Sequence, residues 1–210
     1  DRGEVETIAP GRYLVSDVEL LQSGKHPGKI NMTDADNALN ILRFLGEGPA
    51  AAIMKHNNPS GVALGDSLVE AYLKADLADH VAAFGGCIAL NRPVDVPTAE
   101  AIAARYAEVV VAPEYEAGAV EILARRQNLR IMRVGNVARL SEFAAERFVD
   151  LKSLVDGAVI AQLSYLPQVR TPADLKPPET VHGGRTYRVE RPPHLLDALG
   201  RQRRLRRQRG

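Results

Sequence analysis

The sequence predicts an α/β fold, in which helices cover a largely buried sheet. Short apolar runs that could form strands alternate with helical patterns, and only a few residues link one to the next. The apolar runs are hydrophobic throughout rather than at every second position. That pattern is typical of strands that are covered on both faces, so we expect a sheet with helices on its faces.

The first elements follow a lead-in at residues 1–30, where no clear element is visible. A helix begins where Thr33 or Asp34 caps it, and Gly46 ends it. The next apolar run, at 50–55, is expected to form a buried strand.

The alternation continues to about residue 134. Asp66 is expected to cap one further helix, and Pro97 marks the first turn of another, where its missing N–H costs nothing. The remaining predicted helices are 66–75, 97–106 and 116–126, and the remaining predicted strands are 87–90, 109–111 and 129–134.

After Gly135 this rhythm changes. A helix is expected at 140–148, then two strands at 148–151 and 158–162 around the turn Asp156-Gly157, and later a strand at 187–190. We therefore expect four parts, namely a lead-in at 1–30, an α/β domain at 31–135, a connecting segment at 136–192 and an Arg-rich tail at 193–210.

Composition limits the classes of protein to consider. The net charge of +1 hides six arginines in residues 201–210, without which the remaining chain carries a net charge of −5. Cys87 is the single cysteine, so the chain can form no internal disulfide, and we expect a cytoplasmic protein. The apolar runs are too short to span a bilayer, so no membrane partner is expected.

The stretch from Lys55 to Gly61, KHNNPSG, is the most unusual in the sequence. It stands where a buried strand meets a loop, a common place for ligand-binding groups in α/β folds. An ammonium beside an imidazole disfavours the charged imidazole, so His56 could act as a neutral base near neutral pH. The plain alternative is a surface Lys-His pair beside an ordinary turn.

Three further positions are candidates with equally plain alternatives. Phe84 offers a stacking plane, and Gly85 lets main-chain N–H groups face a ligand, although the pair could be only a tight turn. Asp95 could simply cap the helix that starts at Pro97, and Asn31 could be a turn residue.

Several chemistries are excluded by the sequence. A zinc deaminase needs H-x-E followed by P-C-x-x-C, but His56 is followed by two asparagines and the chain has one cysteine. No P-loop and no G-x-G-x-x-G opening a helix occurs. We therefore expect no metal site.

Together these stretches resemble the AICAR transformylase family. KHNNPSGVA at 55–63 is similar to the family signature K-H-x-N-P-[CS]-G-x-A, with Ser60 where many members have Cys. Six more stretches are similar in the same order, and the resemblance covers about residues 20–170. These are GKIN at 28–31 leading into DADNAL at 34–39, AFGG at 83–86, NR at 91–92 with VD at 94–95, TA at 98–99, EVVVAP at 108–113 and NLR at 128–130.

The resemblance implies a fold, a reaction and a site. The fold is a pair of cytidine-deaminase-like α/β/α halves without zinc, of which this chain holds one half and an incomplete second. The reaction moves a formyl group from 10-formyltetrahydrofolate to the 5-amino group of AICAR ribonucleotide. The catalytic pair corresponds to Lys55 and His56, and the substrate is held by Asn31, Phe84, Gly85 and Asp95. Members are homodimers with shared active sites, often joined to an IMP cyclohydrolase.

Some family motifs are missing from this sequence. These are the upstream R-Y-G-x-N-P segment, the later S-N-[AS] motif and the C-terminal Arg-His region, and near Pro192 the resemblance gives way to the Arg-rich tail. We therefore expect a truncated member with impaired transfer and no residues for the cyclohydrolase reaction. The alternatives are a non-catalytic remnant that keeps the dimer surface, or nucleic-acid binding through residues 201–210, which the acidic body and the lack of aromatics in the tail disfavour.

Overall fold

A computed structural model of the chain describes residues 18–46, 48–166, 179–182 and 185–188. The chain divides into two compact units, residues 1–145 and 146–210. Among the described helices, none is both long and apolar enough to cross a membrane.

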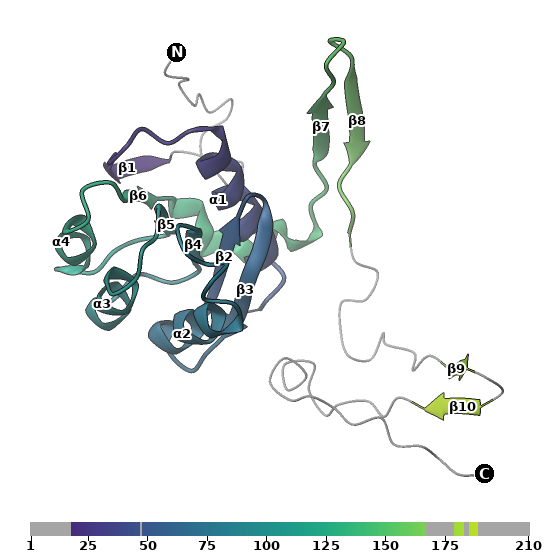
Figure 1. The fold of residues 1–210 in the computed structure, drawn as a ribbon, viewed down its shortest axis with the longest axis horizontal. Coiled ribbons are helices and arrows are strands. Elements are labelled where there is room, and N and C mark those ends of the chain that lie inside the picture. The colour runs from purple at the N-terminus through teal and green to yellow at the C-terminus, as the bar shows by residue number, and fades with distance from the viewer. Residues whose placement is uncertain (1–17, 47, 167–178, 183–184, 189–210) are drawn as a thin grey trace. The chain divides into compact units, whose positions relative to one another are not determined.

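The first unit is built on one six-stranded sheet with the strand order β1-β6-β5-β4-β2-β3 (Figure 1). Its elements in chain order are β1 (Glu19–Gln22), α1 (Lys29–Leu42), β2 (Ala50–Lys55), β3 (Asn58–Leu64), α2 (Leu68–Ala78), β4 (Cys87–Leu90), α3 (Val96–Ala103), β5 (Val109–Ala112), α4 (Ala119–Ala124), β6 (Arg130–Arg133) and a 3₁₀ segment, η1 (Gly135–Ala145).

The sheet is mixed, with parallel pairing between β4 and β5 and between β5 and β6. β2 is antiparallel to both β3 and β4, and β1 is antiparallel to β6. Met54 pairs with Cys87, and Cys87 pairs with Val109. The carboxyl end of β2 therefore lies at the same edge of the sheet as the amino ends of β4 and β5.

Helices cover both faces of this sheet, as the sequence predicts. Alternate residues of each central strand point to opposite faces. On one face Ala52, Met54 and Cys87 pack with α1 and η1. On the other face Ile53 and Ile88 pack with α2, α3 and α4. Because the strands are covered on both sides, they are apolar throughout, and the buried strands predicted from the sequence are confirmed.

The wrong predictions for the first unit include the lead-in and the starts of two helices. The lead-in contains β1, which extends the sheet next to β6. Helix α1 begins at Lys29 rather than at Thr33 or Asp34, because the Asn31 side-chain oxygen accepts from the Gly28 N–H at 3.0 Å and stabilises an earlier start.

Another wrong prediction concerns the start of α2. Its cap is Ser67 rather than Asp66, and the Ser67 hydroxyl accepts from the Glu70 N–H at 3.3 Å.

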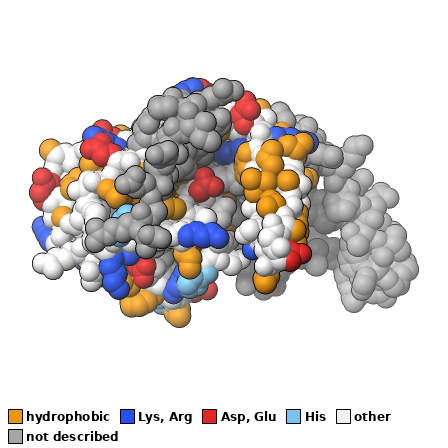
Figure 2. Space-filling model, turned by 90° about the horizontal axis from the view of Figure 1, so that it is seen from above, with side chains coloured by type: hydrophobic (Ala, Val, Ile, Leu, Met, Phe, Trp, Pro, Cys, Tyr) orange, Lys and Arg blue, Asp and Glu red, His pale blue; other side chains and the backbone are white. Residues whose placement is uncertain are grey.

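The second unit contains two hairpins. β7 (Val149–Ser153) pairs with β8 (Val159–Leu163), which confirms the hairpin predicted around Asp156-Gly157, and β9 (Glu179–His182) pairs with β10 (Arg185–Arg188). The helix predicted at 140–148 is instead the 3₁₀ segment η1 followed by β7. Apolar side chains of β7 and β8 are exposed, and they gather on the hairpin in Figure 2. The Arg-rich tail lies outside the described residues.

Candidate active site

Lys55 and His56 lie at the point where β2 turns into β3. Lys55 pairs with Asn58, so the hairpin turn consists of two residues, His56 and Asn57. Both have left-handed backbone angles, with φ of 53° and 62°. The His56 side chain is exposed at the tip of this turn, and Lys55 is half-buried at the end of the strand.

The ammonium of Lys55 has a defined partner in the structure. Its Nζ donates to the main-chain oxygen of Phe84 at 2.6 Å. Lys55 follows Ile53 by two residues, so its side chain leaves the sheet on the face that α2 covers. The ammonium therefore joins the catalytic candidate to the loop that precedes β4.

Phe84 and Gly85 end the loop between α2 and β4. The Phe84 side chain is 61% exposed, and its ring centroid lies 4.9 Å from that of Tyr106, at an interplanar angle of 38°. Gly85 has φ of 74°, and its N–H donates to the main-chain oxygen of Tyr106 at 2.9 Å. A Cβ on Gly85 would lie only 3.2 Å from the Tyr106 ring, so both the angle and the space favour glycine here.

Asn31 reaches the same edge from the first turn of α1. While its oxygen accepts from Gly28, its Nδ2 lies 3.4 Å from Glu108 Oε2. Glu108 also lies 3.5 Å from the Nη1 of Arg130, whose side chain is only 8% exposed. Asn31 is thereby placed beside a carboxylate at the amino end of β5.

Glu108 lies next to Asn31 and Gly85, although it is not among the site residues predicted from the sequence. A Cβ on Gly85 would come within 3.8 Å of Glu108 Oε1. The available signal was the position of Glu108, immediately before the apolar run Val109–Ala112. A strand start is a weak signal, because only the strand order shows which starts lie side by side.

Asp95 is not brought to this cluster but lies at the start of α3. It follows the carboxyl end of β4, and its Oδ1 accepts from the Thr98 N–H at 2.8 Å as the cap of α3. Lys55 and Phe84 lie at the opposite edge, where β4 begins. The plain alternative for Asp95, a helix cap, is therefore the one that the structure supports.

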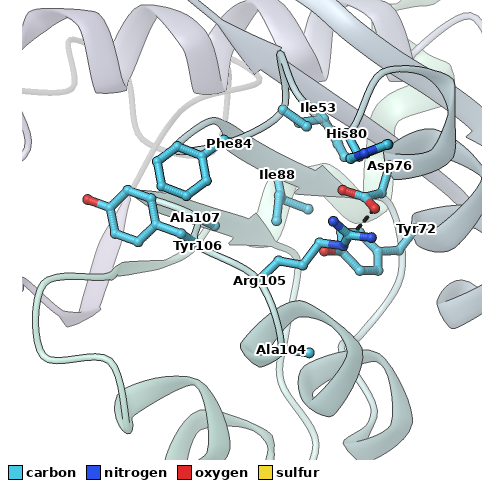
Figure 3. A pocket seen from close by; sticks show the side chains of 11 residues that line it. Ile53, Tyr72, Asp76, His80, Phe84, Ile88, Ala104, Arg105, Tyr106 and Ala107 are labelled. Carbon is cyan, nitrogen blue, oxygen red and sulfur yellow. Dashed lines mark ion pairs between the residues drawn. The ribbon is translucent and has the colours of Figure 1, made fainter.

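A cavity of about 260 Å³ opens on the α2 face of the sheet, beside Phe84 (Figure 3). Phe84 and Tyr106 form one side of it, and the ion pair between Arg105 Nε and Asp76 Oδ2, at 2.8 Å, forms the other. Ile53, Ile88, Ala83 and Ala107 supply apolar lining, with Tyr72, His80 and Ala104 completing it.

Ionisation in and near this cavity follows from burial. Desolvation raises the pKa of the Tyr72 hydroxyl to about 12, and the nearby Asp76 carboxylate acts in the same direction. Desolvation also raises the pKa of the Cys87 thiol, which lies on the α1 face at the start of β4. Cys87 is 2% exposed and packs as a small apolar residue. In the described part of the chain, no group of three or more His, Cys, Asp or Glu side chains is placed to hold a metal ion.

Comparisons with known proteins agree with the motifs. The sequence pattern of the family described as AICARFT/IMPCHase bienzyme matches residues 6–176. The bifunctional purine biosynthesis protein PurH of Myxococcus xanthus is 40% identical over 155 residues, which is 74% of this chain and 30% of that protein. PurH of Rhizobium rhizogenes is 51% identical over 123 residues, which is 58% of this chain and 23% of that protein.

Among solved structures, Acinetobacter baumannii RibD resembles part of this chain. The matched region covers 53% of this chain and 38% of the RibD chain, with a TM-score of 0.41 and 16% sequence identity. This chain spans less than a third of the length of the PurH relatives described above. The resemblance found from the motifs is confirmed by the match over residues 6–176, and the chain belongs to the AICARFT/IMPCHase bienzyme family.

Proposed function

We propose that this chain carries part of the active site that transfers a formyl group from 10-formyltetrahydrofolate to the 5-amino group of AICAR ribonucleotide. The observation that supports this most directly is the turn at Lys55 and His56. It presents an exposed imidazole next to an ammonium that is fixed on the Phe84 carbonyl. Family membership supplies the reaction, and this geometry supplies residues that could perform it.

The chemistry requires two proton transfers. The amine nitrogen of AICAR attacks the formyl carbon, and the bond from that carbon to the folate nitrogen breaks. His56 takes the proton that the amine loses, and Lys55 assists delivery of a proton to the departing folate nitrogen. An exposed imidazole can reach a bound amine, whereas a packed one could not.

The substrate residues are proposed with one change from the sequence analysis. Asn31, Phe84 and Gly85 are proposed to hold the base and ribose of AICAR, and Glu108 replaces Asp95. A carboxylate accepts hydrogen bonds from ribose hydroxyl groups, and that of Glu108 lies beside Asn31.

The aromatic wall of the cavity, formed by Phe84 and Tyr106, suits one ring of the folate donor. The cavity volume of about 260 Å³ is below the roughly 300–1,000 Å³ of sites that enclose whole ligands. It can therefore accept one ring of a folate against Phe84 and Tyr106, and the remainder of the donor would lie outside it.

We also propose the finer features that the resemblance implies. These are a homodimer with shared active sites, a deaminase-like half without zinc, a domain at 31–135 to which β1 adds an edge strand, and a connecting segment at 136–192. The mixed sheet with helices on both faces is compatible with such a half. The competing proposal is a remnant that keeps the dimer surface but does not bind AICAR.

Titration of AICAR ribonucleotide into the 210-residue chain separates these two proposals. We expect saturable binding that Asn31→Ala weakens about tenfold, the effect of one lost hydrogen bond. The matched control is Asn128→Ala, at an exposed asparagine between α4 and β6. A folded chain that binds no AICAR would favour the remnant.

Formyl transfer provides the second test. His56→Ala should abolish transfer from 10-formyltetrahydrofolate, since it removes the proposed base. His26→Ala removes another exposed imidazole, which does not line the cavity, and should leave most of the transfer. Equal turnover of His56→Ala and wild type would defeat the assigned role.

A further inference from the structure

The turn at His56 and Asn57 adopts a conformation that its residues rarely take. Two consecutive left-handed residues form the hairpin turn that Asn-Gly sequences prefer. A histidine in this conformation brings its Cβ close to the following carbonyl oxygen, which costs free energy. A contact from elsewhere in the molecule can offset this cost and stabilise the turn in this form.

Asp34 supplies that contact. It lies on α1, its side chain is buried, and the residue is only 5% exposed. Its Oδ2 accepts from the His56 N–H at 3.3 Å, and its Oδ1 accepts from the Asn57 N–H at 2.6 Å. Successive backbone N–H groups of a turn can point into one concavity that suits an anion. The Asp34 carboxylate occupies that concavity.

The residues one turn away on α1 extend the contact. Asn37 Nδ2 donates to the Asn57 side-chain oxygen at 3.0 Å, and Asn31 lies next to Glu108. Residues 31, 34 and 37 are three apart, so they form one stripe on the helix. A single polar stripe of α1 therefore contacts both the turn and the carboxylate at β5.

We propose that Asp34 is a positioning residue, whose carboxylate holds the His56-Asn57 turn in its left-handed form and so sets the direction of the His56 imidazole. The backbone angles of a residue fix where its Cβ points, so a change of turn conformation redirects the ring. The catalytic meaning of this role rests on the proposed function, whereas the conformational role does not.

The conformational role is tested by NMR on the 210-residue chain. Asp34→Asn keeps the side-chain shape but replaces one acceptor with an NH₂ that faces an N–H. We expect the His56 and Asn57 carbon shifts to lose their left-handed signature and the Asn57 amide to exchange about tenfold faster, as for a lost charge-assisted hydrogen bond. Glu121→Gln, at an exposed acid on α4, controls for the change in charge.

A second substitution separates positioning from general stability. Glycine adopts a φ of 62° at no steric cost, so Asn57→Gly should restore the left-handed turn in the Asp34→Asn background. Asp34→Asn alone should lower kcat about tenfold with little change in KM, and the double variant should recover to within about threefold of wild type. If Asp34 only stabilised α1, the substitution Asn57→Gly in the turn would not restore kcat in the Asp34→Asn background.

These experiments test the positioning role of Asp34 separately from the proposed formyl transfer. Unchanged shifts and exchange in Asp34→Asn overturn it, and so does a double variant whose turn or kcat does not recover. If Asp34→Asn does not fold, the double variant must fold and recover, and an unfolded double variant also overturns the proposal. If the shifts respond and recover but wild type transfers no formyl group, the positioning role stands and the proposed function fails.

Discussion

The side-chain nitrogen of Lys55 donates to the main-chain oxygen of Phe84 across 2.6 Å, which joins the end of β2 to the loop before β4. The two residues are 29 positions apart in the sequence, and the antiparallel pairing of β2 with β4 brings them together. A side chain from one segment and a ring from another are thereby held at the same edge of the sheet.

Replacing Lys55 with methionine tests this link. Methionine keeps the apolar stem but leaves the Phe84 carbonyl without its ammonium donor. We expect formyl transfer to fall by about 100-fold, in the range of a lost proton-transfer group, and the Gly85 amide to exchange faster. Lys74→Met, at an exposed lysine of α2, is the control and should change little. Full transfer by Lys55→Met would contradict the proposed role.

Cys87 should be chemically inert in the folded chain. Its thiol is buried at the start of β4, and burial raises its pKa, so the reactive thiolate is scarce near neutral pH. We expect no labelling by iodoacetamide under native conditions and complete labelling in denaturant, as measured by mass spectrometry. Labelling of the native chain at the rate of a free thiol would show that β4 opens readily.

Stability should decline in alkaline solution through Tyr72. Its folded-state pKa is raised to about 12, above an ordinary value of 10, because the hydroxyl is buried beside Asp76. A raised pKa gives stability that is fully present below pH 10 and is lost as the pH rises toward 12. The expected slope is about 1.4 kcal/mol per pH unit for one proton.

Thermal unfolding from pH 9 to 12 measures this loss. Tyr72→Phe cannot ionise, so its stability should decline less steeply than that of wild type. Burial also raises the pKa of Tyr115, so part of the alkaline loss should remain in the variant. Identical slopes for the two proteins would exclude Tyr72 as a source.

The sequence predicts the central strands well because their apolar runs are bounded by proline and glycine. It misses β3, since Asn58, Pro59 and Gly61 are residues that local rules assign to turns. As the edge strand of the sheet, β3 tolerates a proline, and a bulge near Ile53 absorbs one extra residue. Whether residues 58–64 can form a strand depends on their place at the edge of the sheet, and the local sequence does not reveal the strand order.

The candidate site shows the same limit. Lys55 and His56 stand out because a charged pair follows an apolar run, and Phe84 and Gly85 because an aromatic precedes glycines. Asp95 and Glu108 cannot be told apart in this way, because each is an acid close to an element start. Only the pairing of β4 with β5 shows that Glu108 shares an edge with Lys55.

Gly61 belongs to the motif KHNNPSGVA at 55–63 that resembles the family signature. In the structure the space beside Gly61 is filled by α2, since a Cβ on Gly61 would lie 1.9 Å from the Ala75 oxygen and 3.1 Å from the Ala78 Cβ. The Ala75 oxygen is helix backbone and cannot turn aside. Gly61→Ala must therefore push α2 away from β3, at a cost of about 3 kcal/mol or more.

Denaturant unfolding of Gly61→Ala measures this cost. Gly48→Ala is the matched control, because its Cβ would meet only Leu64 Cδ2, at an ordinary 3.5 Å. We expect the control to unfold within about 0.5 kcal/mol of wild type, as for a substitution that meets no obstacle. If Gly61→Ala is as stable as wild type but no longer binds AICAR, the space belongs to a ligand and the packing role is wrong. If it is destabilised and the control is not, the contact between α2 and β3 is sufficient to explain why glycine stands at position 61.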